Sequence, residues 1–293
     1  MRGVHAILYA LFDAEERLDR ALMRRQVDLC LEAGVAGIAA LGLATEGTKL
    51  TFDERLAMMT WVAEDVAGKA PLGFTIIGAS VAEQVAQLRH AEAVGATWAV
   101  LQPPAVGGYD AEEYLRFFGR IMRSTRLPIA IQNAPQYLGR GLSDTDIARL
   151  RADHPNFTLI KSESSAAEAA TLIRMAPDLM VFNGRGGQQM LECLDAGCSG
   201  FLLAPDAVDY AVRIMRAYDA GDRRTAEALY AEVVPAIDFV MASIKQLICY
   251  GKRLFAARAG LPVHDRAPAQ RPDAAGLAEV ARLAKSMGRF PLR

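Results

Sequence analysis

The chain has 293 residues, of which 52% are hydrophobic, and its 33 basic and 34 acidic side chains give a net charge of −1. This length and composition exclude a disordered chain, a collagen-like chain and a small disulfide scaffold. The balanced charge offers no electrostatic basis for binding nucleic acid or an acidic membrane, so neither partner is predicted.

Eight short apolar runs alternate with longer amphipathic stretches along most of the chain, which is typical of βαβ units. Eight such units without a long linker predict an α/β fold of the (β/α)₈ or TIM barrel type. The predicted strands are Gly3 to Phe12, Gly37 to Gly42, Leu72 to Gly78, Trp98 to Gln102, Pro128 to Gln132, Phe157 to Lys161, Leu179 to Phe182 and Gly200 to Leu203.

Helix starts are marked by Ser, Thr or Asp followed three residues later by an acid, the capping-box pattern. An open doubly wound sheet is the alternative fold, but it favours a glycine-rich turn after the first strand, where the chain has Leu11-Phe12-Asp13-Ala14. The predicted caps are Thr51/Glu54, Ser80/Glu83, Asp110/Glu113, Ser143/Asp146 and Ser165/Glu168.

The chain divides by pattern into a barrel over residues 1–221 and a C-terminal helical extension over residues 222–293 that packs on it as one structural unit. We expect a cytoplasmic protein, because the four cysteines are scattered and no signal or membrane-spanning segment is visible. Cys193 and Cys198 are five residues apart, but no second pair completes a zinc site. The four histidines show no ligand spacing either, so no metal is predicted.

Only one of the six lysines, Lys161, lies in a strongly apolar predicted strand. Burial there disfavours the ammonium form and makes the amine a nucleophile toward carbonyl groups. A lysine that merely caps the strand and reaches solvent is the alternative interpretation. Because side chains alternate along a strand, Glu163 should point the same way as Lys161 and supply a proton shuttle beside it. A simple ion pair is the alternative role for Glu163.

These residues give the chain a resemblance to the class I aldolase group of dihydrodipicolinate synthase and N-acetylneuraminate lyase. The resemblance covers almost the whole chain and includes the turn Gly42 to Glu46, the segment Asn133-Ala134-Pro135, Ile160-Lys161 and Gly200-Phe201-Leu202. It implies a barrel enzyme in which Lys161 forms an imine with a 2-oxo acid and needs no other cofactor. It also implies a homo-oligomer, a tetramer or a dimer.

The chain departs from this family at positions that matter for the reaction. The two hydroxyl residues of the usual turn fall on Leu43 and Ala44, the family's tyrosine falls on Gln132, and Tyr137 stands where some members have an arginine. The Thr-Pro-Tyr-Tyr pattern of those members is Gln102-Pro103-Pro104-Ala105 here. The usual hydroxyl relay is therefore missing, and an amide such as Gln132 cannot replace a phenol in proton transfer.

The resemblance also assigns substrate contacts. The carboxylate of the 2-oxo acid is expected on backbone N–H groups of the turn after the second strand, with help from the eighth strand. Further polar residues are expected to contact the remaining substrate oxygens and the distal end. The predicted binding residues are Leu43, Ala44, Thr45, Gln132, Tyr137, Asn183, Gly184, Arg185 and Leu202.

Dehydration of a 2-oxo-3-deoxy sugar acid is the reaction that these residues favour, because one carboxylate, Glu163, can remove the C3 proton and protonate the departing C4 hydroxyl. Some sugar-acid dehydratases of the family are similar in using a glutamate close to the lysine. Two alternatives stay open: aldol chemistry on a 2-oxo acid, including dihydrodipicolinate synthesis, and a barrel that binds a 2-oxo acid without turnover.

Overall fold

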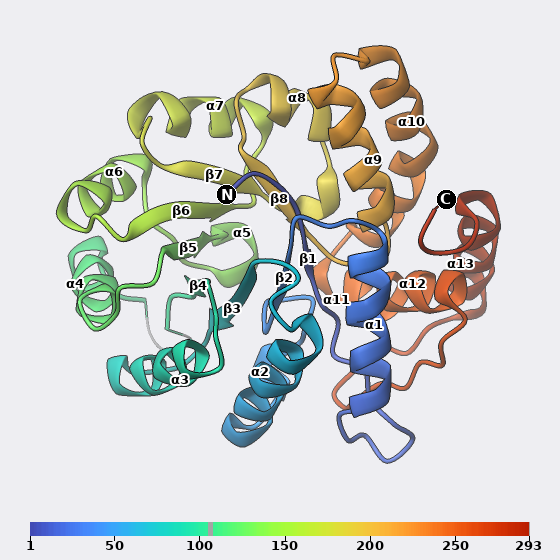
Figure 1. The fold of residues 1–293 in the computed structure, drawn as a ribbon, viewed down its shortest axis with the longest axis horizontal. Helices are drawn as coiled ribbons and strands as arrows, with labels where there is room; N and C mark the ends of the chain where they lie inside the picture. Colours follow the sequence, from blue (N-terminus) through green and yellow to red (C-terminus); the bar gives the residue numbers. More distant parts are fainter. Residues whose placement is uncertain (105–107, 293) are drawn as a thin grey trace.

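The computed structural model describes residues 1–104 and 108–292 and shows a closed barrel of eight parallel strands surrounded by helices (Figure 1). The strands pair in chain order, and β1 closes the barrel against β8. The predicted barrel is confirmed, and Ala105 of the segment after strand four lies outside the described residues. The strands are β1 (Gly3–Ile7), β2 (Gly37–Ala40), β3 (Leu72–Ile76), β4 (Trp98–Leu101), β5 (Ile129–Asn133), β6 (Phe157–Ser162), β7 (Met180–Asn183) and β8 (Gly200–Leu203).

Helices alternate with the strands and cover their outer faces, which buries both faces of nearly every strand. The barrel helices are α1 (Arg20–Glu32), α2 (Phe52–Val66), α3 (Val81–Ala93), α4 (Ala111–Met122), α5 (Pro135–Leu138), α6 (Asp144–Asp153), α7 (Ala166–Met175), α8 (Met190–Asp195) and α9 (Val208–Asp219), with short turns η1 (Gly47–Lys49) and η2 (Arg185–Gly187). The C-terminal elements are α10 (Arg223–Val240), α11 (Ile244–Gln246), η3 (Leu247–Gly251), α12 (Lys252–Ala259) and α13 (Ala274–Met287).

All five predicted helix caps accept a backbone N–H bond, but only three form complete capping boxes. Thr51, Ser143 and Ser165 pair reciprocally with the acid three residues later. The two remaining acids, Glu83 and Glu113, bond elsewhere. Glu83 accepts from the amide of Ala79 and from Arg55, and Glu113 pairs with Arg116.

The first strand is shorter than predicted, because β1 ends at Ile7 and not at Phe12. Beyond Leu8, the backbone of Tyr9 bonds to the side chain of Gln26 and not to a neighbouring strand. Gln26 Oε1 accepts from the amide of Tyr9, and Gln26 Nε2 donates to the carbonyl of Tyr9. The segment stays buried, so its apolar sequence is explained by packing and not by strand pairing.

Aromatic rings fill the barrel interior below the carboxyl ends of the strands. The ring of His5 lies 5.7 Å from that of Trp98 and 5.1 Å from that of Phe182, both near edge-on. Gly73 leaves room for the indole, because a Cβ there would lie 2.3 Å from Trp98. Burial lowers the pKa of His5 to about 4, so the imidazole is neutral and its role is packing.

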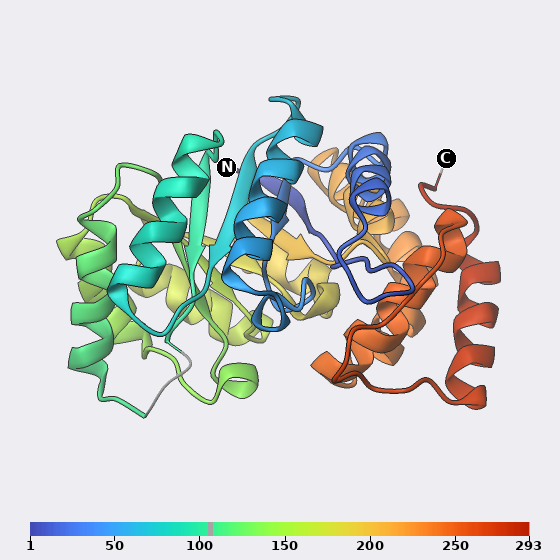
Figure 2. The ribbon, with the colours of Figure 1, turned by 90° about the horizontal axis from the view of Figure 1, so that it is seen from below.

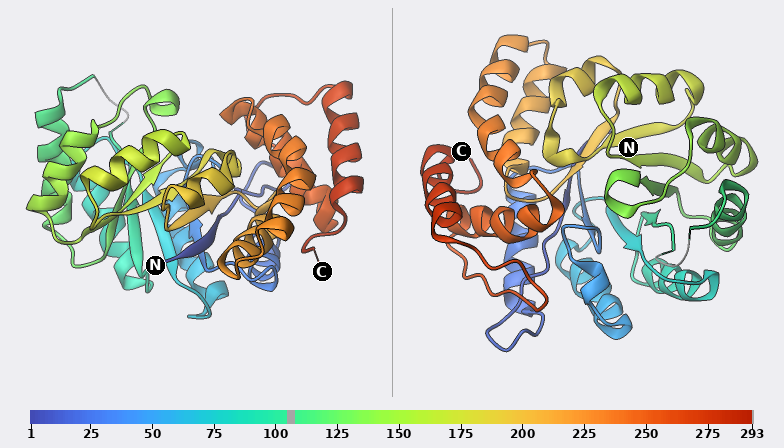
Figure 3. Two further views of the ribbon diagram at one scale, coloured as in Figure 1. Left: turned by 90° about the horizontal axis from the view of Figure 1, so that it is seen from above. Right: turned by 180° about the vertical axis from the view of Figure 1, so that it is seen from behind.

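The C-terminal helices α12 and α13 stack on one flank of the barrel beside α10 (Figures 2 and 3). Asp222 caps α10, which begins directly after the predicted end of the barrel; the boundary at 221/222 itself stays a prediction. Arg258 on α12 is bonded to the carboxylate of Asp209 on α9, and both side chains are buried. Over the described residues, no single helix is both long and apolar enough to cross a membrane.

Candidate active site

Lys161 lies near the carboxyl end of β6, the end of the barrel where such folds place their sites. Its residue is only 5% exposed, and its register partners on the two neighbouring strands are Gln132 and Phe182. Side chains of paired residues on parallel strands point to the same face, so all three are directed into the barrel. The predicted lysine is therefore buried at the interior of the barrel mouth.

The carboxylate of Glu163 lies directly beside this amine. Lys161 Nζ is 2.6 Å from Glu163 Oε1, and both side chains are at most 6% exposed. The second oxygen, Oε2, accepts a hydrogen bond of 2.6 Å from the backbone N–H of Arg185. The carbonyl of Glu163 accepts from Gln136 Nε2, which ties the residue to α5. The alternation predicted from Lys161-x-Glu163 is thus seen in the geometry.

A cavity of about 40 Å³ opens onto both groups. Its wall is apolar except for Lys161, Glu163 and Arg185, so a bound molecule is shielded from water around the amine. The predicted residues that line it are Lys161, Glu163, Leu43, Ala44, Gly184, Arg185 and Leu202, and the remainder are Ile7, Gly186, Leu203, Ala204, Met241, Ile244 and Leu247.

The turn after β2 presents two backbone donors at this cavity. Within residues 1–104 and 108–292, no acceptor is found for the N–H groups of Leu43 and Ala44, whereas Thr45 donates to the carbonyl of Gly42. Adjacent free N–H groups form a site for an anion such as a carboxylate. The loss of the two hydroxyl residues therefore leaves the main-chain donors in place.

A model of the dihydrodipicolinate synthetase family matches residues 1–287. The chain belongs to the dihydrodipicolinate synthetase family. Among curated relatives, it is 27% identical to L-2-keto-3-deoxyarabonate dehydratase of Azospirillum brasilense over 244 residues, which cover 81% of this chain and 79% of the relative. It is also 27% identical to the probable 2-dehydro-3-deoxy-D-pentonate aldolase YjhH of Escherichia coli K12 over 270 residues, covering 89% and 88%.

Among solved structures, a putative dihydrodipicolinate synthetase from Pseudomonas aeruginosa superposes with a TM-score of 0.90 at 23% identity, covering 98% of this chain and 99% of that one. This likeness confirms the fold of the family. Members of the dihydrodipicolinate synthetase family are lyases that act on small molecules, and the chain is a lyase in this general sense. The expected homo-oligomer stays a prediction.

Four predicted substrate contacts of this family member do not line the cavity. Thr45 is buried and its hydroxyl donates to the carbonyl of Leu8. Asn183 donates to the carbonyl of Ser164 and to Cys193 Sγ, so its amide lies on the α8 side of β7. The expectation that Asn183 binds the distal end of the substrate stays a prediction, and this position does not support it. The register explains the position: Phe182 pairs with Lys161 and points inward, which turns Asn183 outward.

Gln132 differs from these two residues because its register directs it inward. Its Oε1 accepts a 2.8 Å bond from Gln102 Nε2, and no partner of its own Nε2 is present within the described ranges. The bond from Gln102 fixes the orientation of the Gln132 amide and leaves its Nε2 donor without a partner in the described residues. Whether it contacts substrate stays a prediction.

Tyr137 lines a second, larger cavity of about 560 Å³ next to the first. Glu163 and Arg185 line both cavities and so form the boundary between them. Burial and the negative charge of Glu163 raise the pKa of Tyr137, so its phenol stays protonated. The larger cavity is lined mainly by polar side chains. Its other lining residues include Gln136, Asp144, Ser162, Ser164 and Glu168.

Sequence reasoning missed the contribution of the C-terminal segment to the site. Met241, Ile244 and Leu247 cover the cavity from the extension, and no charge or motif distinguishes them from packing residues. No motif in the sequence indicates the bond between Gln102 and Gln132. Within the described part of the chain, no cluster of three or more His, Cys, Asp or Glu side chains has the geometry to hold a metal.

Proposed function

We propose that the protein is a lyase that forms an imine between Lys161 and a 2-oxo acid and removes water from a 2-oxo-3-deoxy sugar acid. The observation that carries the proposal is the 2.6 Å contact between Lys161 Nζ and Glu163 Oε1 at an apolar cavity. The free N–H groups of Leu43 and Ala44 at the same cavity suit the substrate's carboxylate.

The reaction balances with these two side chains. Lys161 passes a proton to Glu163, and the neutral amine attacks C2 of the substrate. Glu163 then returns this proton to the former carbonyl oxygen, which leaves as water and gives the protonated imine, with Glu163 again a carboxylate. The imine acidifies the C3 proton, which Glu163 removes to leave an enamine. Glu163 then gives that proton to the C4 hydroxyl, which leaves as a second water molecule. One water hydrolyses the imine and frees Lys161. The imine is itself the electron sink, so the proposal needs no cofactor.

Aldol chemistry is the second candidate, and Tyr137 is the observation in its favour. Cleavage between C3 and C4 requires that the C4 hydroxyl lose its proton. The neutral phenol of Tyr137 lines the cavity that shares Glu163 and Arg185, and a phenol can relay such a proton to a carboxylate. One curated relative is named a dehydratase and another a probable aldolase, so the family contains both chemistries. Loss of water and release of pyruvate are distinct products that separate the two candidates.

The test begins with borohydride reduction in the presence of pyruvate, followed by mass spectrometry of the peptide that contains Lys161. Lys161→Ala should abolish the adduct, while Lys285→Ala, which alters an exposed lysine on α13, should leave it intact. If the wild-type protein forms no adduct with pyruvate or other 2-oxo acids, the barrel only binds and the catalytic proposal fails.

The second arm supplies 2-oxo-3-deoxy acids derived from pentoses and hexoses and identifies the products. Glu163→Gln keeps the shape of the side chain but cannot take a proton. We expect the adduct to form more slowly, with water as the acceptor of the Lys161 proton, and dehydration to fall by roughly 10²- to 10⁴-fold. Glu192→Gln, an exposed change on α8, is the matched control. Release of pyruvate that Tyr137→Phe abolishes would replace the dehydratase by the aldolase.

A further inference from the structure

The glycine-rich segment Gly184 to Gly187 follows β7, and such segments often bind the phosphate of a ligand through their backbone N–H groups. Here the N–H of Arg185 is already used, because it donates to Glu163 Oε2 at 2.6 Å. The anion that this turn binds is therefore a carboxylate of the protein itself. This carboxylate is that of Glu163, which carries out the proton transfers in the proposed function.

The turn is shaped to approach the carboxylate closely. A Cβ on Gly184 would lie 2.3 Å from Glu163 Oε2 and 2.5 Å from its carboxyl carbon, so only glycine leaves this space free. The N–H of Gly184 donates to the carbonyl of Ser162, which fixes the turn to the end of β6. Arg185 has a φ of 48°, a left-handed conformation that costs free energy in a residue other than glycine.

The C-terminal extension supports the turn from its other side. A Cβ on Gly186 would lie 2.4 Å from Met241 Cγ and 3.6 Å from Ile237, so the end of α10 packs against the backbone of η2. The strained conformation of Arg185 is thus enclosed between β6 and the extension. Strain that the surrounding structure imposes in this way is common where a functional group must be held in place.

We propose that the Gly184–Arg185 turn is a positioning element for Glu163, which keeps Oε1 beside C3 of the substrate by holding Oε2. In the resting site the ammonium of Lys161 also holds the carboxylate, but this contact changes when the amine becomes an imine. Glu163 lines the larger cavity as well, so an unheld side chain is free to rotate into it. The backbone contact persists through the reaction. This inference rests on the proposed function.

The test uses exchange of the methyl protons of pyruvate in D₂O, which needs the imine and a positioned base but not the natural substrate. Gly184→Ala should lower the exchange rate by roughly 100-fold or more, and by a much larger factor than it lowers borohydride trapping with pyruvate. Gly108→Ala is the matched control, because Gly108 is exposed and its added Cβ meets nothing within 4 Å. Normal exchange in a folded Gly184→Ala protein that forms the adduct would refute the positioning role.

Two other outcomes are distinguishable. Loss of both the adduct and the exchange in Gly184→Ala, with the fold intact by circular dichroism, would mean that the turn shapes the whole site and does not act on Glu163 in particular. Absence of the adduct in the wild-type protein would instead refute the proposed function.

A second measurement does not depend on the folding of the Gly184→Ala protein. The amide hydrogen of Arg185 should exchange slowly in the wild-type protein and at least about tenfold faster in Glu163→Ala, because its acceptor is gone. Unchanged protection in Glu163→Ala would overturn the contact on which the inference rests.

Discussion

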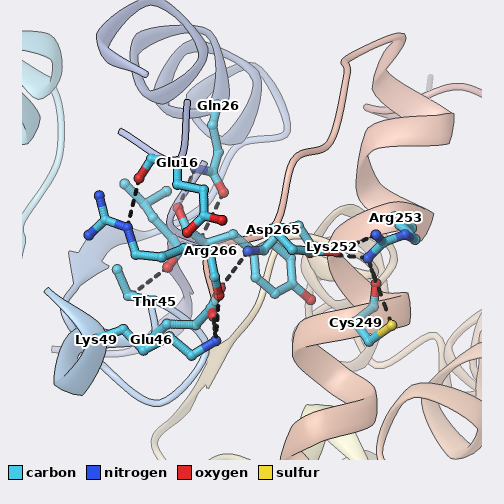
Figure 4. A network of polar contacts seen from close by, with 12 residues as sticks. Glu16, Gln26, Thr45, Glu46, Lys49, Cys249, Lys252, Arg253, Asp265 and Arg266 are labelled. Atoms are coloured by element: carbon cyan, nitrogen blue, oxygen red, sulfur yellow. Dashed lines mark hydrogen bonds and ion pairs between the residues drawn. The ribbon is translucent and has the colours of Figure 1, made fainter. Parts of the chain in front are cut away.

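The protein contains two buried lysine–glutamate pairs, and they serve different purposes. Lys161 and Glu163 are two residues apart and face a cavity at the barrel mouth. Lys252 and Glu46 are 206 residues apart and join α12 to the turn before η1, and their side chains are 0% and 1% exposed. Figure 4 shows the second pair within a wider polar network that ties the C-terminal segment to the barrel.

The partners of each glutamate explain the difference. Glu46 is bonded to Lys252 through one oxygen and to Lys49 through the other, so two cations hold it as an anion. Glu163 has a single cation, Lys161, and a neutral backbone N–H. When Lys161 reacts, Glu163 is left without an ammonium partner and is able to exchange protons. A glutamate held by two lysines has no comparable freedom.

Burial of a lysine is therefore a poor guide to reactivity without access to a cavity. Lys252 is more buried than Lys161, and desolvation lowers its pKa although Glu46 opposes this effect. It lies 5.2 Å above the ring of Phe12 and does not line the cavity at Lys161. Lys161 is slightly less buried than Lys252 and lines that cavity.

Replacing Lys252 or Lys161 by methionine should show which lysine supports the stability of the fold and which supports imine formation. These are the largest effects that we expect. Lys252→Met leaves Glu46 with only Lys49, and breaking a buried pair in this way typically costs about 3–5 kcal/mol of the free energy of unfolding. Lys161→Met should cost less, because Glu163 keeps its bond to Arg185, but it should eliminate the adduct with pyruvate. Urea denaturation and borohydride trapping measure the two effects. A folded Lys252→Met protein that forms no adduct would contradict the division of roles.

The fold and the contact between Lys161 and Glu163 were predictable because their signals are local. Alternation of apolar runs and the caps such as Thr51 each depend on a few neighbouring residues. Lys161 and Glu163 share one side of a single strand end, so alternation alone brings them together. The same rule places Asn183 on the outer face of β7, because it follows the inward-facing Phe182.

The remaining features depend on contacts distant in sequence. Nothing near Lys252 in the chain indicates Glu46 as its partner, and α12 reads as a surface helix because it begins with Lys-Arg. Met241, Ile244 and Leu247 reach the cavity only because the extension folds back over the barrel mouth. The strand predicted over Gly3 to Phe12 was too long because a buried amide from α1, that of Gln26, replaces the ladder.

The pH dependence of stability should include a contribution from Asp206, whose backbone carbonyl accepts a hydrogen bond from Arg258 of α12. Asp206 is fully buried, and burial raises its pKa from 3.8 to about 6 although the hydrogen bond from Tyr9 opposes the shift. A carboxyl group whose pKa is higher in the folded state favours folding at low pH. Its contribution is complete below about pH 4 and is lost as the pH rises through 6.

Asp206→Asn should remove this dependence while keeping an oxygen acceptor for the hydroxyl of Tyr9. Relative to the wild-type protein, the variant should gain on the order of 3 kcal/mol in unfolding free energy between pH 4 and 7, from a shift of about two pKa units. Urea denaturation across this range measures the difference, and the pH dependence of pyruvate trapping should stay the same in both proteins. A constant stability difference between pH 4 and 7 would show that Asp206 titrates normally.

The smallest expected loss of unfolding free energy comes from replacing Lys49, the partly exposed lysine that pairs with Glu46. Lys49 is 20% exposed and bonds both to Glu46 and to the carbonyl of Arg266. Because Lys252 still neutralises Glu46 and water solvates the vacated position, Lys49→Met should cost only about 0.5–1 kcal/mol by urea denaturation. Combined with Lys252→Met, it leaves Glu46 buried without a cation, so the double variant should lose more than the sum of the single losses. If the two losses of unfolding free energy simply add, Lys49 and Lys252 act independently. The number of cations around a glutamate would then not explain the different roles proposed for Glu46 and Glu163.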